Sequence, residues 1–180
     1  MDIPPSRFQK EYHLNSSQDA KRPSDSAVTL SVLMGPGDAN LLGNVHGGVI
    51  MRLVDEAGAL AAMRHARRSV VTVRLDSMSF LEPVLVGDLL QLKATVNWVG
   101  RTSIEVGVRV EAENPITGAH THTNSAYAVY VALGEQGRPQ EVCPLLLETD
   151  EEKRRWSEAE TRREHRLQQK EEKAQEQKRP

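Results

Sequence analysis

Apolar and polar residues alternate with a period of two along five stretches of the chain, and this period predicts five β-strands. The stretches cover residues 27–34, 70–80, 88–98, 103–113 and 121–133. Between the first and the second stretch, residues 49–65 repeat apolar side chains at helical spacing. This spacing predicts one amphipathic helix.

The order of these elements predicts an α+β fold. One helix after the first strand, followed by four strands in succession, favours a curved, mainly antiparallel five-stranded sheet wrapped around one long central helix. Small residues crowd the second half of the helix, among them Ala57, Gly58 and Ala61, so a sheet can approach it closely.

The alternation also groups side chains by face. The series along residues 88–98 ends at Trp98, and the series along residues 121–133 runs through Tyr127 and Val129. A sheet covered by a single helix leaves its edges and one face to protect, and we expect dimerisation through the sheet.

Composition divides the chain of 180 residues into three parts. Residues 1–25 are rich in Ser, Pro, Lys and Asp and are interpreted as a flexible arm. Residues 26–146 hold the repeated apolar segments and are long enough for one core. Residues 147–180 are charged and are predicted to form a helical extension, which Thr149 and Glu152 begin with a capping box. Because its positive and negative charges nearly balance, we interpret the extension as a solvated helix held by i,i+4 pairs rather than as an interaction tail.

Charge and hydropathy narrow the range of partners. A net charge of −2 gives no reason to expect nucleic acid or an anionic membrane as the main partner. No segment approaches the roughly 20 apolar residues of a membrane span, and the N-terminus has no apolar signal core. The one cysteine, Cys143, cannot form an internal disulfide, which fits a reducing compartment, and we expect a cytoplasmic protein.

The most distinctive motif is Gly-Asn-Val-His-Gly-Gly, from Gly43 to Gly48, which leads into the predicted helix. The first N–H groups of a helix have no intrahelical partner, and glycine permits close approach to them. They can bind a carbonyl oxygen that gains negative charge, with Asn44 beside it. The same residues suit an ordinary helix cap and turn, and the motif by itself favours neither interpretation.

Asp55 follows Gly48 by seven residues and therefore lies on nearly the same side of the helix. A partly desolvated carboxylate among apolar side chains suits a general base, whereas the neighbouring Glu56 fits a solvent-facing acid. The separation of about 10 Å along the helix axis is too large for one helix to bring both groups to the same carbonyl. We therefore predict a composite site at a dimer interface, in which one chain gives Asn44 and the Gly47 region and the other gives Asp55.

Four segments, in order along one domain, resemble the hotdog-fold acyl-CoA thioesterases. They are GNVHGG, RLVDEAGALAAMRH, SFLEPVLVGD and VGRTSIEV, and the resemblance extends from about Val28 to Pro144. The chain is most similar to the cytosolic long-chain (brain-type) acyl-CoA hydrolases and their single-domain bacterial relatives. The ending PLLLETDEEKRRW also resembles the charged C-terminal extension of the brain-type enzymes.

The resemblance implies an acyl-CoA thioesterase that hydrolyses fatty acyl-CoA to free fatty acid and CoA, with no metal and no other cofactor. In two-domain members a catalytic Asn of the GNVHGG motif and a catalytic Asp of the helix come from different hotdog domains. Asn44 and Asp55 match these residues, so a homodimer of this chain would have two complete sites. The match also favours Asp55 over Glu56, and the family implies assembly as a trimer of dimers.

The same resemblance assigns further residues to the substrate. Oxyanion and substrate contacts fall to His46, Gly47 and Gly48. The CoA phosphates and adenine would lie near Gly100, Arg101, Thr102 and Ser103. Each residue of this second group, taken singly, also suits a simple hairpin turn. Asp55 would act as general base for water or attack the thioester directly.

The sequence leaves an alternative function open and does not assign a role to several polar residues. The alternative function is a non-catalytic acyl-CoA-binding sensor of the same fold, while a hotdog dehydratase would need an Asp/His pair that the helix lacks. His120 and His122 share one side of a strand, without a third metal ligand nearby. Asp76 and Ser77 are candidates to line an acyl pocket, and periodicity does not decide which of them points inward.

Overall fold

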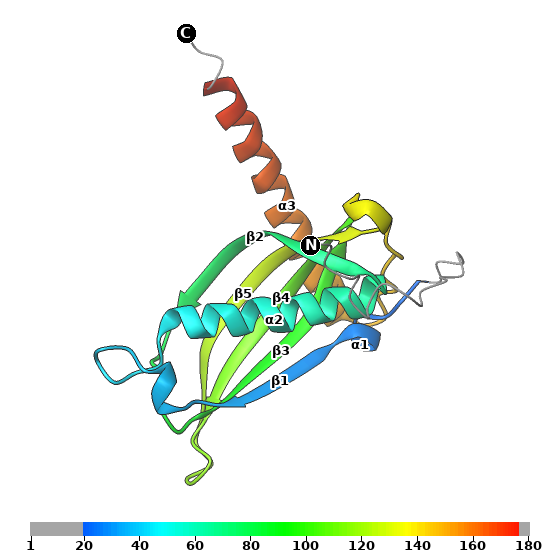
Figure 1. Cartoon of the computed structure of the whole chain (residues 1–180). Coiled ribbons are helices and arrows are strands. Elements are labelled where there is room, and N and C mark those ends of the chain that lie inside the picture. The colour runs from blue at the N-terminus through cyan, green and yellow to red at the C-terminus, as the bar shows by residue number, and fades with distance from the viewer. Residues whose placement is uncertain (1–19, 177–180) are drawn as a thin grey trace, which may run out of the picture.

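One sheet folds around one helix, and a second long helix lies outside the sheet (Figure 1). The computed structural model describes residues 20–176, so residues 1–19 of the predicted arm and residues 177–180 lie outside the described residues. At the start of the described part, Lys21 forms a parallel bridge with Leu145, and α1 (Pro23–Ser26) follows with Pro23 and Ser26 buried. The interpretation as a flexible arm therefore does not hold for residues 21–25. Among residues 20–176, no helix combines the length and the apolar content that a membrane crossing requires.

Five strands form the sheet in the order β1–β3–β4–β5–β2. Their bounds are β1 (Val28–Leu33), β2 (Ser69–Phe80), β3 (Leu89–Val99), β4 (Ser103–Glu113) and β5 (His120–Leu133). Every neighbouring pair is antiparallel. The fold class predicted from the sequence is confirmed, and β1 and β2 are the two edges of the sheet.

The central helix is α2 (Gly47–Ala66), and the sheet curves around it (Figure 1). Its C-cap is Arg67, which adopts the left-handed conformation (φ 53°) and donates its N–H to the carbonyl of Met63 at 2.7 Å. Its buried face carries Ile50, Leu53, Val54, Ala57, Gly58, Ala61, Ala62 and His65, whereas Leu60, which the helical spacing places with the apolar residues, is 42% exposed. Two short 3₁₀ turns, η2 (Pro36–Asp38) and η3 (Glu135–Gly137), lie in the connecting loops.

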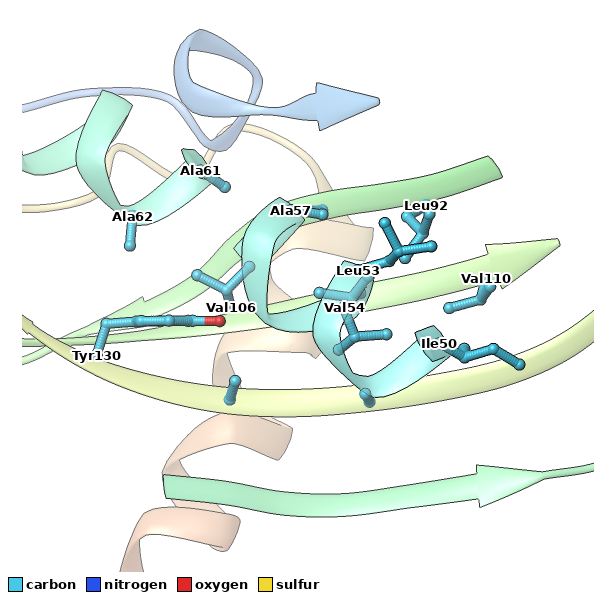
Figure 2. Packing of buried hydrophobic residues seen from close by; sticks show 14 of the residues in the cluster. Ile50, Leu53, Val54, Ala57, Ala61, Ala62, Leu92, Val106, Val110 and Tyr130 are labelled. Atoms are coloured by element: carbon cyan, nitrogen blue, oxygen red, sulfur yellow. The ribbon is translucent and has the colours of Figure 1, made fainter. Parts of the chain in front are cut away.

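Small residues let α2 and the sheet pack in direct contact (Figure 2). Ala57, Ala61 and Ala62 are fully buried. Gly58 faces Tyr130 of β5 so closely that a Cβ atom at position 58 would lie 2.3 Å from Tyr130 Oη. A larger side chain at this position would force the helix away from the sheet, so this packing requires glycine there.

Local irregularity decides which side chains of the sheet face α2. A register shift between Val96 and Trp98 places Trp98 on the outer face, where its ring centroid lies 6.0 Å from that of Trp156. The inner face of β5 carries Ala126, Ala128, Tyr130 and Ala132, not the series that includes Tyr127. Alternation alone did not reveal either assignment, because a shift of one residue exchanges the two faces of a strand.

The second long helix, α3 (Asp150–Glu176), packs its first half on the outer face of the sheet, and its second half projects away from the sheet (Figure 1). The predicted capping box is present. Thr149 N–H donates to the Glu152 carboxylate at 2.9 Å, and Glu152 N–H donates to Thr149 Oγ1 at 3.2 Å. Because Ala159 is fully buried, the interpretation as a purely solvated helix is wrong for the first half.

A buried carboxylate binds α3 to the sheet. Glu105 of β4 is fully buried and accepts hydrogen bonds from Arg162 at 2.7 and 3.0 Å and from Arg166 at 2.8 Å. Arg166 also forms an ion pair with Asp76 of β2. Hydrogen bonds from two guanidinium groups offset the cost of removing the carboxylates from water.

Glu105→Gln is expected to lower the free energy of unfolding by about 3 kcal/mol, because it leaves two partly buried guanidinium groups without their central charge. Urea unfolding followed by circular dichroism measures the change. Lys93→Ala, which breaks the more exposed pair with Glu111, is the control and should cost about 0.5 kcal/mol. Equal costs for the two variants would contradict the assigned importance of the buried pair.

Candidate functional site

The loop before α2 folds back on itself and carries two asparagines. Asn40 N–H donates to the carbonyl of Asn44 at 2.7 Å, and the Asn40 side-chain oxygen accepts the N–H of Leu42 at 2.8 Å. Gly43, with φ 84°, makes the tight turn between them. These bonds hold both asparagines half-buried near the start of α2.

A cleft of about 410 Å³ opens beside this loop, against the segment that follows β2. Its walls are mostly apolar, and its polar side chains are those of Asn40, Asn44 and Glu82. Phe80 lines the cleft, and its Cζ atom lies only 3.3 Å from where a Cβ atom on Gly47 would stand. Glycine at position 47 therefore allows the aromatic ring to lie against the start of the helix.

His46 caps α2 and accepts a hydrogen bond from one of the two glycine N–H groups that the motif could offer to a substrate. Its Nδ1 atom accepts the N–H of Gly48 at 2.9 Å. Among the described residues, none accepts the N–H of Gly47, which lines the cleft. The structure thus presents one open amide, at Gly47, and gives His46 a structural task at the helix start.

Asp55 lies two turns into α2, beside the edge strand β2. Thr72 Oγ1 donates to Asp55 Oδ1 at 2.7 Å, and Tyr130 Oη lies 3.4 Å from the same oxygen. No described residue donates to Asp55 Oδ2. The side chain is exposed in the single chain, contrary to the partial desolvation that its apolar neighbours suggested, so only a second chain or a substrate can desolvate it.

One chain does not bring Asn44 and Asp55 together. Asn44 lines the cleft at the start of α2, and Asp55 is not among the residues that line it. The partners of Asp55 are instead Thr72 and Tyr130, on two strands of the sheet. The composite site therefore stays a prediction, because it requires a second chain.

The predicted CoA-binding residues form the turn between β3 and β4. Gly100 N–H donates to the carbonyl of Ser103 at 2.8 Å, and the Arg101 side chain is 80% exposed. The carbonyl of Arg101 accepts the N–H of Val142. The carbonyl of Cys143, the residue after Val142, lies 2.9 Å from His65 Nε2 near the end of α2. A helix of 20 residues is about 30 Å long, so within one chain this turn and the cleft lie at opposite ends of α2.

Two other polar groupings lie apart from the cleft. Cys143 Sγ is 3.4 Å from His65 Nε2, and burial lowers the pKa of His65 and raises that of Cys143. Both groups are therefore neutral near pH 7. A second hollow, of about 220 Å³, lies on the outer face of the sheet beside α3, where Lys93 and Arg109 are paired with Glu111. It is separated from α2 by the sheet.

The structure also places the remaining polar candidates. Asp76 does not line the cleft, since its carboxylate pairs with Arg74 and Arg166 on the outer face. His122 Nε2 lies 2.8 Å from the carbonyl of Asn124. Within the described part of the chain, no three His, Cys, Asp or Glu side chains are arranged to hold a metal ion.

Four residues of this region were not selected from the sequence. They are Asn40, Thr72, Phe80 and Tyr130. Thr72 and Tyr130 reach Asp55 only because β2 and β5 pair beside α2, which no local pattern reveals. The sequence did contain a signal for Asn40. It is a polar residue in the same loop, four positions before Asn44, and is an equal candidate to orient a substrate.

Comparison with known proteins relates this geometry to a family. The thioesterase superfamily matches residues 42–119. The cytosolic acyl coenzyme A thioester hydrolase of Mus musculus is 33% identical over 141 residues, which cover 77% of this chain and 37% of the relative. This chain therefore spans little more than a third of the length of that relative.

For similar proteins of solved structure, the matched region covers nearly the whole chain of the relative. An apo-hexameric acyl-CoA thioesterase is 39% identical with a TM-score of 0.81, over 83% of this chain and 96% of that chain. The acyl-CoA hydrolase of Staphylococcus aureus, solved with butyryl coenzyme A, coenzyme A and coenzyme A disulfide, is 34% identical with a TM-score of 0.80. That match covers 87% of this chain and 96% of that chain. Further structures of this hydrolase carry alanine in place of one Asp, one Asn or one Thr.

His46→Ala is expected to lower the free energy of unfolding by about 1 kcal/mol, because the N–H of Gly48 loses its side-chain acceptor. His46→Asn restores a side-chain acceptor at the N-cap and should recover most of the loss. Chemical denaturation of the three proteins measures the difference. Equal stability of the Ala and Asn variants would show that the cap contributes nothing.

Proposed function

This chain belongs to the thioesterase superfamily, and from that premise we propose that it hydrolyses acyl-CoA thioesters to free fatty acid and CoA. The observation that carries the proposal is the Asp55 carboxylate, which Thr72 holds at one oxygen while the other oxygen is open. An open carboxylate oxygen of this kind can accept a proton from water. The proposal adds a cytoplasmic location, supported by the name of the mouse relative.

The substrate class is supported by the relatives and by the cleft. The hydrolase of Staphylococcus aureus was solved with butyryl coenzyme A. In this chain the cleft offers apolar surface from Ile50, Phe80 and Val84 beside two asparagines, which suits an acyl chain that ends in a polar thioester.

Residue spacing favours Asn40 over Asn44 as the asparagine of the site. In the Staphylococcus aureus hydrolase the substituted Asn precedes the substituted Asp by 15 residues, and the substituted Thr follows that Asp by 17. Asn40, Asp55 and Thr72 have these same spacings, whereas Asn44 precedes Asp55 by 11 residues. We therefore assign the orientation of the thioester or water to Asn40, and the carbonyl of Asn44 holds the loop closed.

The working unit of this proposal is a dimer joined along β2. This strand is an edge of the sheet, and it exposes 43% of Val71 and 54% of Val73. A two-fold axis across the edge sets the two α2 helices antiparallel. Asp55 and the turn of residues 100–103 of one chain then lie toward the cleft of the other. The apo-hexameric neighbour supports further assembly of the dimers in threes.

The reaction needs no cofactor in such a site. The thioester oxygen accepts the N–H of Gly47, at the positive end of the α2 dipole. Asp55 of the second chain takes a proton from water while the water oxygen attacks the carbonyl carbon. The tetrahedral intermediate collapses with cleavage of the C–S bond, and the departing CoA sulfur receives the proton that Asp55 took from water, which restores the carboxylate. Direct attack by Asp55 would form a mixed anhydride instead. If water then attacks the Asp55 carboxyl carbon of that anhydride, oxygen-18 from water enters Asp55 in a single turnover, and such label would rule out the simple base mechanism.

Asp55→Asn is expected to reduce kcat for palmitoyl-CoA by about 100- to 10,000-fold, because the amide cannot accept the proton of water. Release of free thiol measures the rate. Glu56→Gln is the matched control, since Glu56 is the adjacent acid and pairs with Arg52 on the surface. Full activity of Asp55→Asn would exclude Asp55 as the base, and tight binding without turnover by the wild type would favour the sensor.

Mixed dimers test the composite site and the choice of asparagine. Asn40→Ala and Asp55→Ala homodimers should both be inactive, and mixing them should restore part of the wild-type rate because each heterodimer regains one intact site. Asn44→Ala, the control, should retain more activity than Asn40→Ala. No recovery after subunit exchange has been demonstrated would contradict the shared site, and greater loss in Asn44→Ala would return the role to Asn44.

A further inference from the structure

Tyr130 is a fully buried residue whose hydroxyl ends at the part of α2 that carries Asp55. Its side chain extends from β5 through the apolar core toward the helix (Figure 2). Oη lies 3.2 Å from the backbone carbonyl of Asp55 and 3.4 Å from Asp55 Oδ1. One hydroxyl therefore contacts both the backbone and the carboxylate of the proposed base.

The helix accommodates this hydroxyl through an unfavourable residue. A Cβ atom on Gly58 would lie 2.3 Å from Tyr130 Oη and 3.0 Å from Cζ, so the hydroxyl is the closest contact. Glycine in the middle of a helix lowers its stability relative to alanine. Phenylalanine at position 130 would fill the apolar space without burying a hydroxyl. The pair of Tyr130 and Gly58 thus points to a role of the hydroxyl other than packing.

Thr72 and Tyr130 act on the same oxygen of Asp55 from two different strands. Thr72 on β2 donates to Oδ1 at 2.7 Å, and the Tyr130 hydroxyl approaches it from β5. Thr72 gives the short hydrogen bond to Oδ1, and the single Tyr130 hydroxyl proton is shared between Oδ1 and the backbone carbonyl of Asp55. Together these contacts restrict rotation of the carboxylate and leave Oδ2 open. Burial, and then the charge of Asp55, raise the pKa of Tyr130, so its hydroxyl stays protonated and remains a donor.

We propose that Tyr130 is a positioning residue for the hydrolysis proposed above: with Thr72, it holds Asp55 so that Oδ2 faces the attacking water. The inference rests on the proposed function and adds a residue that does not touch the substrate. Loss of the hydroxyl removes the orientation of the base but no substrate contact. It should therefore lower kcat and leave KM unchanged.

Tyr130→Phe is expected to lower kcat by about 10-fold, with KM for acyl-CoA within about twofold of the wild type. Tyr127→Phe is the matched control, because Tyr127 lies on the same strand, on the outer face, with its ring 3.7 Å from the Arg162 guanidinium. It should leave kcat unchanged. Steady-state kinetics of the three proteins, with Tm measured on each, separates loss of turnover from loss of fold.

A second variant tests the same hydroxyl from the helix side, and its effect in the wild-type background does not need Tyr130→Phe to fold. Gly58→Ala pushes the tyrosine hydroxyl away from Asp55, so it should lower kcat in the wild-type background and have less effect in the Tyr130→Phe background. An equal effect of Gly58→Ala in both backgrounds would contradict the role of the hydroxyl.

A measurement independent of activity separates this inference from the proposed function. Tm values of Tyr130→Phe, Asp55→Ala and the double variant form a cycle, and the changes should be non-additive if the hydroxyl binds the carboxylate. Additive changes, or unaltered kcat in Tyr130→Phe, would overturn the positioning role alone. Absence of turnover in the wild type would overturn the proposed function and the inference with it, whatever the cycle shows.

Discussion

The close contact between α2 and the sheet is the constraint on which the rest of this structure depends. Ala57, Ala61 and Ala62 are fully buried, and Gly58 leaves no side chain between the helix and Tyr130. A sheet can curve around a helix at this distance only if the facing residues are small. Because the two layers touch, a hydroxyl that starts on β5 reaches Asp55 on the helix. The same contact between α2 and β5 thus packs the core and brings the Tyr130 hydroxyl to Asp55.

The outer face of the sheet is covered by different physical means. A sheet that wraps one helix still has a second face, and α3 covers part of it through Glu105, Arg162 and Arg166 together with the Trp98–Trp156 contact. A buried carboxylate with two guanidinium donors fixes the position of α3 more specifically than apolar contact alone. The edge strand β2 pairs only with β5 among the described strands, and our proposed dimer forms at this edge.

The length of α2 explains why the proposed site needs two chains. The helix spans about 30 Å, with the cleft and Gly47 at its start, Asp55 two turns along it, and the turn of residues 100–103 near its end. A straight helix cannot bring these groups to one substrate. An antiparallel partner can, because its helix end lies beside the start of the first helix. In this proposal, association completes the site rather than only protecting the sheet edge.

The sequence by itself determined the five strands, the two long helices, the order of these elements, the fold class and the start of α3, because the periods of strands and helices and the Thr149–Glu152 box depend on residues close in the chain. It also located Asp55 on α2. Only the tertiary structure decided that Trp98 faces outward, that α3 binds the sheet, and that Thr72 and Tyr130 hold Asp55. Those two partners lie 17 and 75 residues from Asp55. Strand pairing and β-bulges determine which distant side chains meet, and the periodic pattern of apolar residues along the chain does not specify this pairing or these bulges.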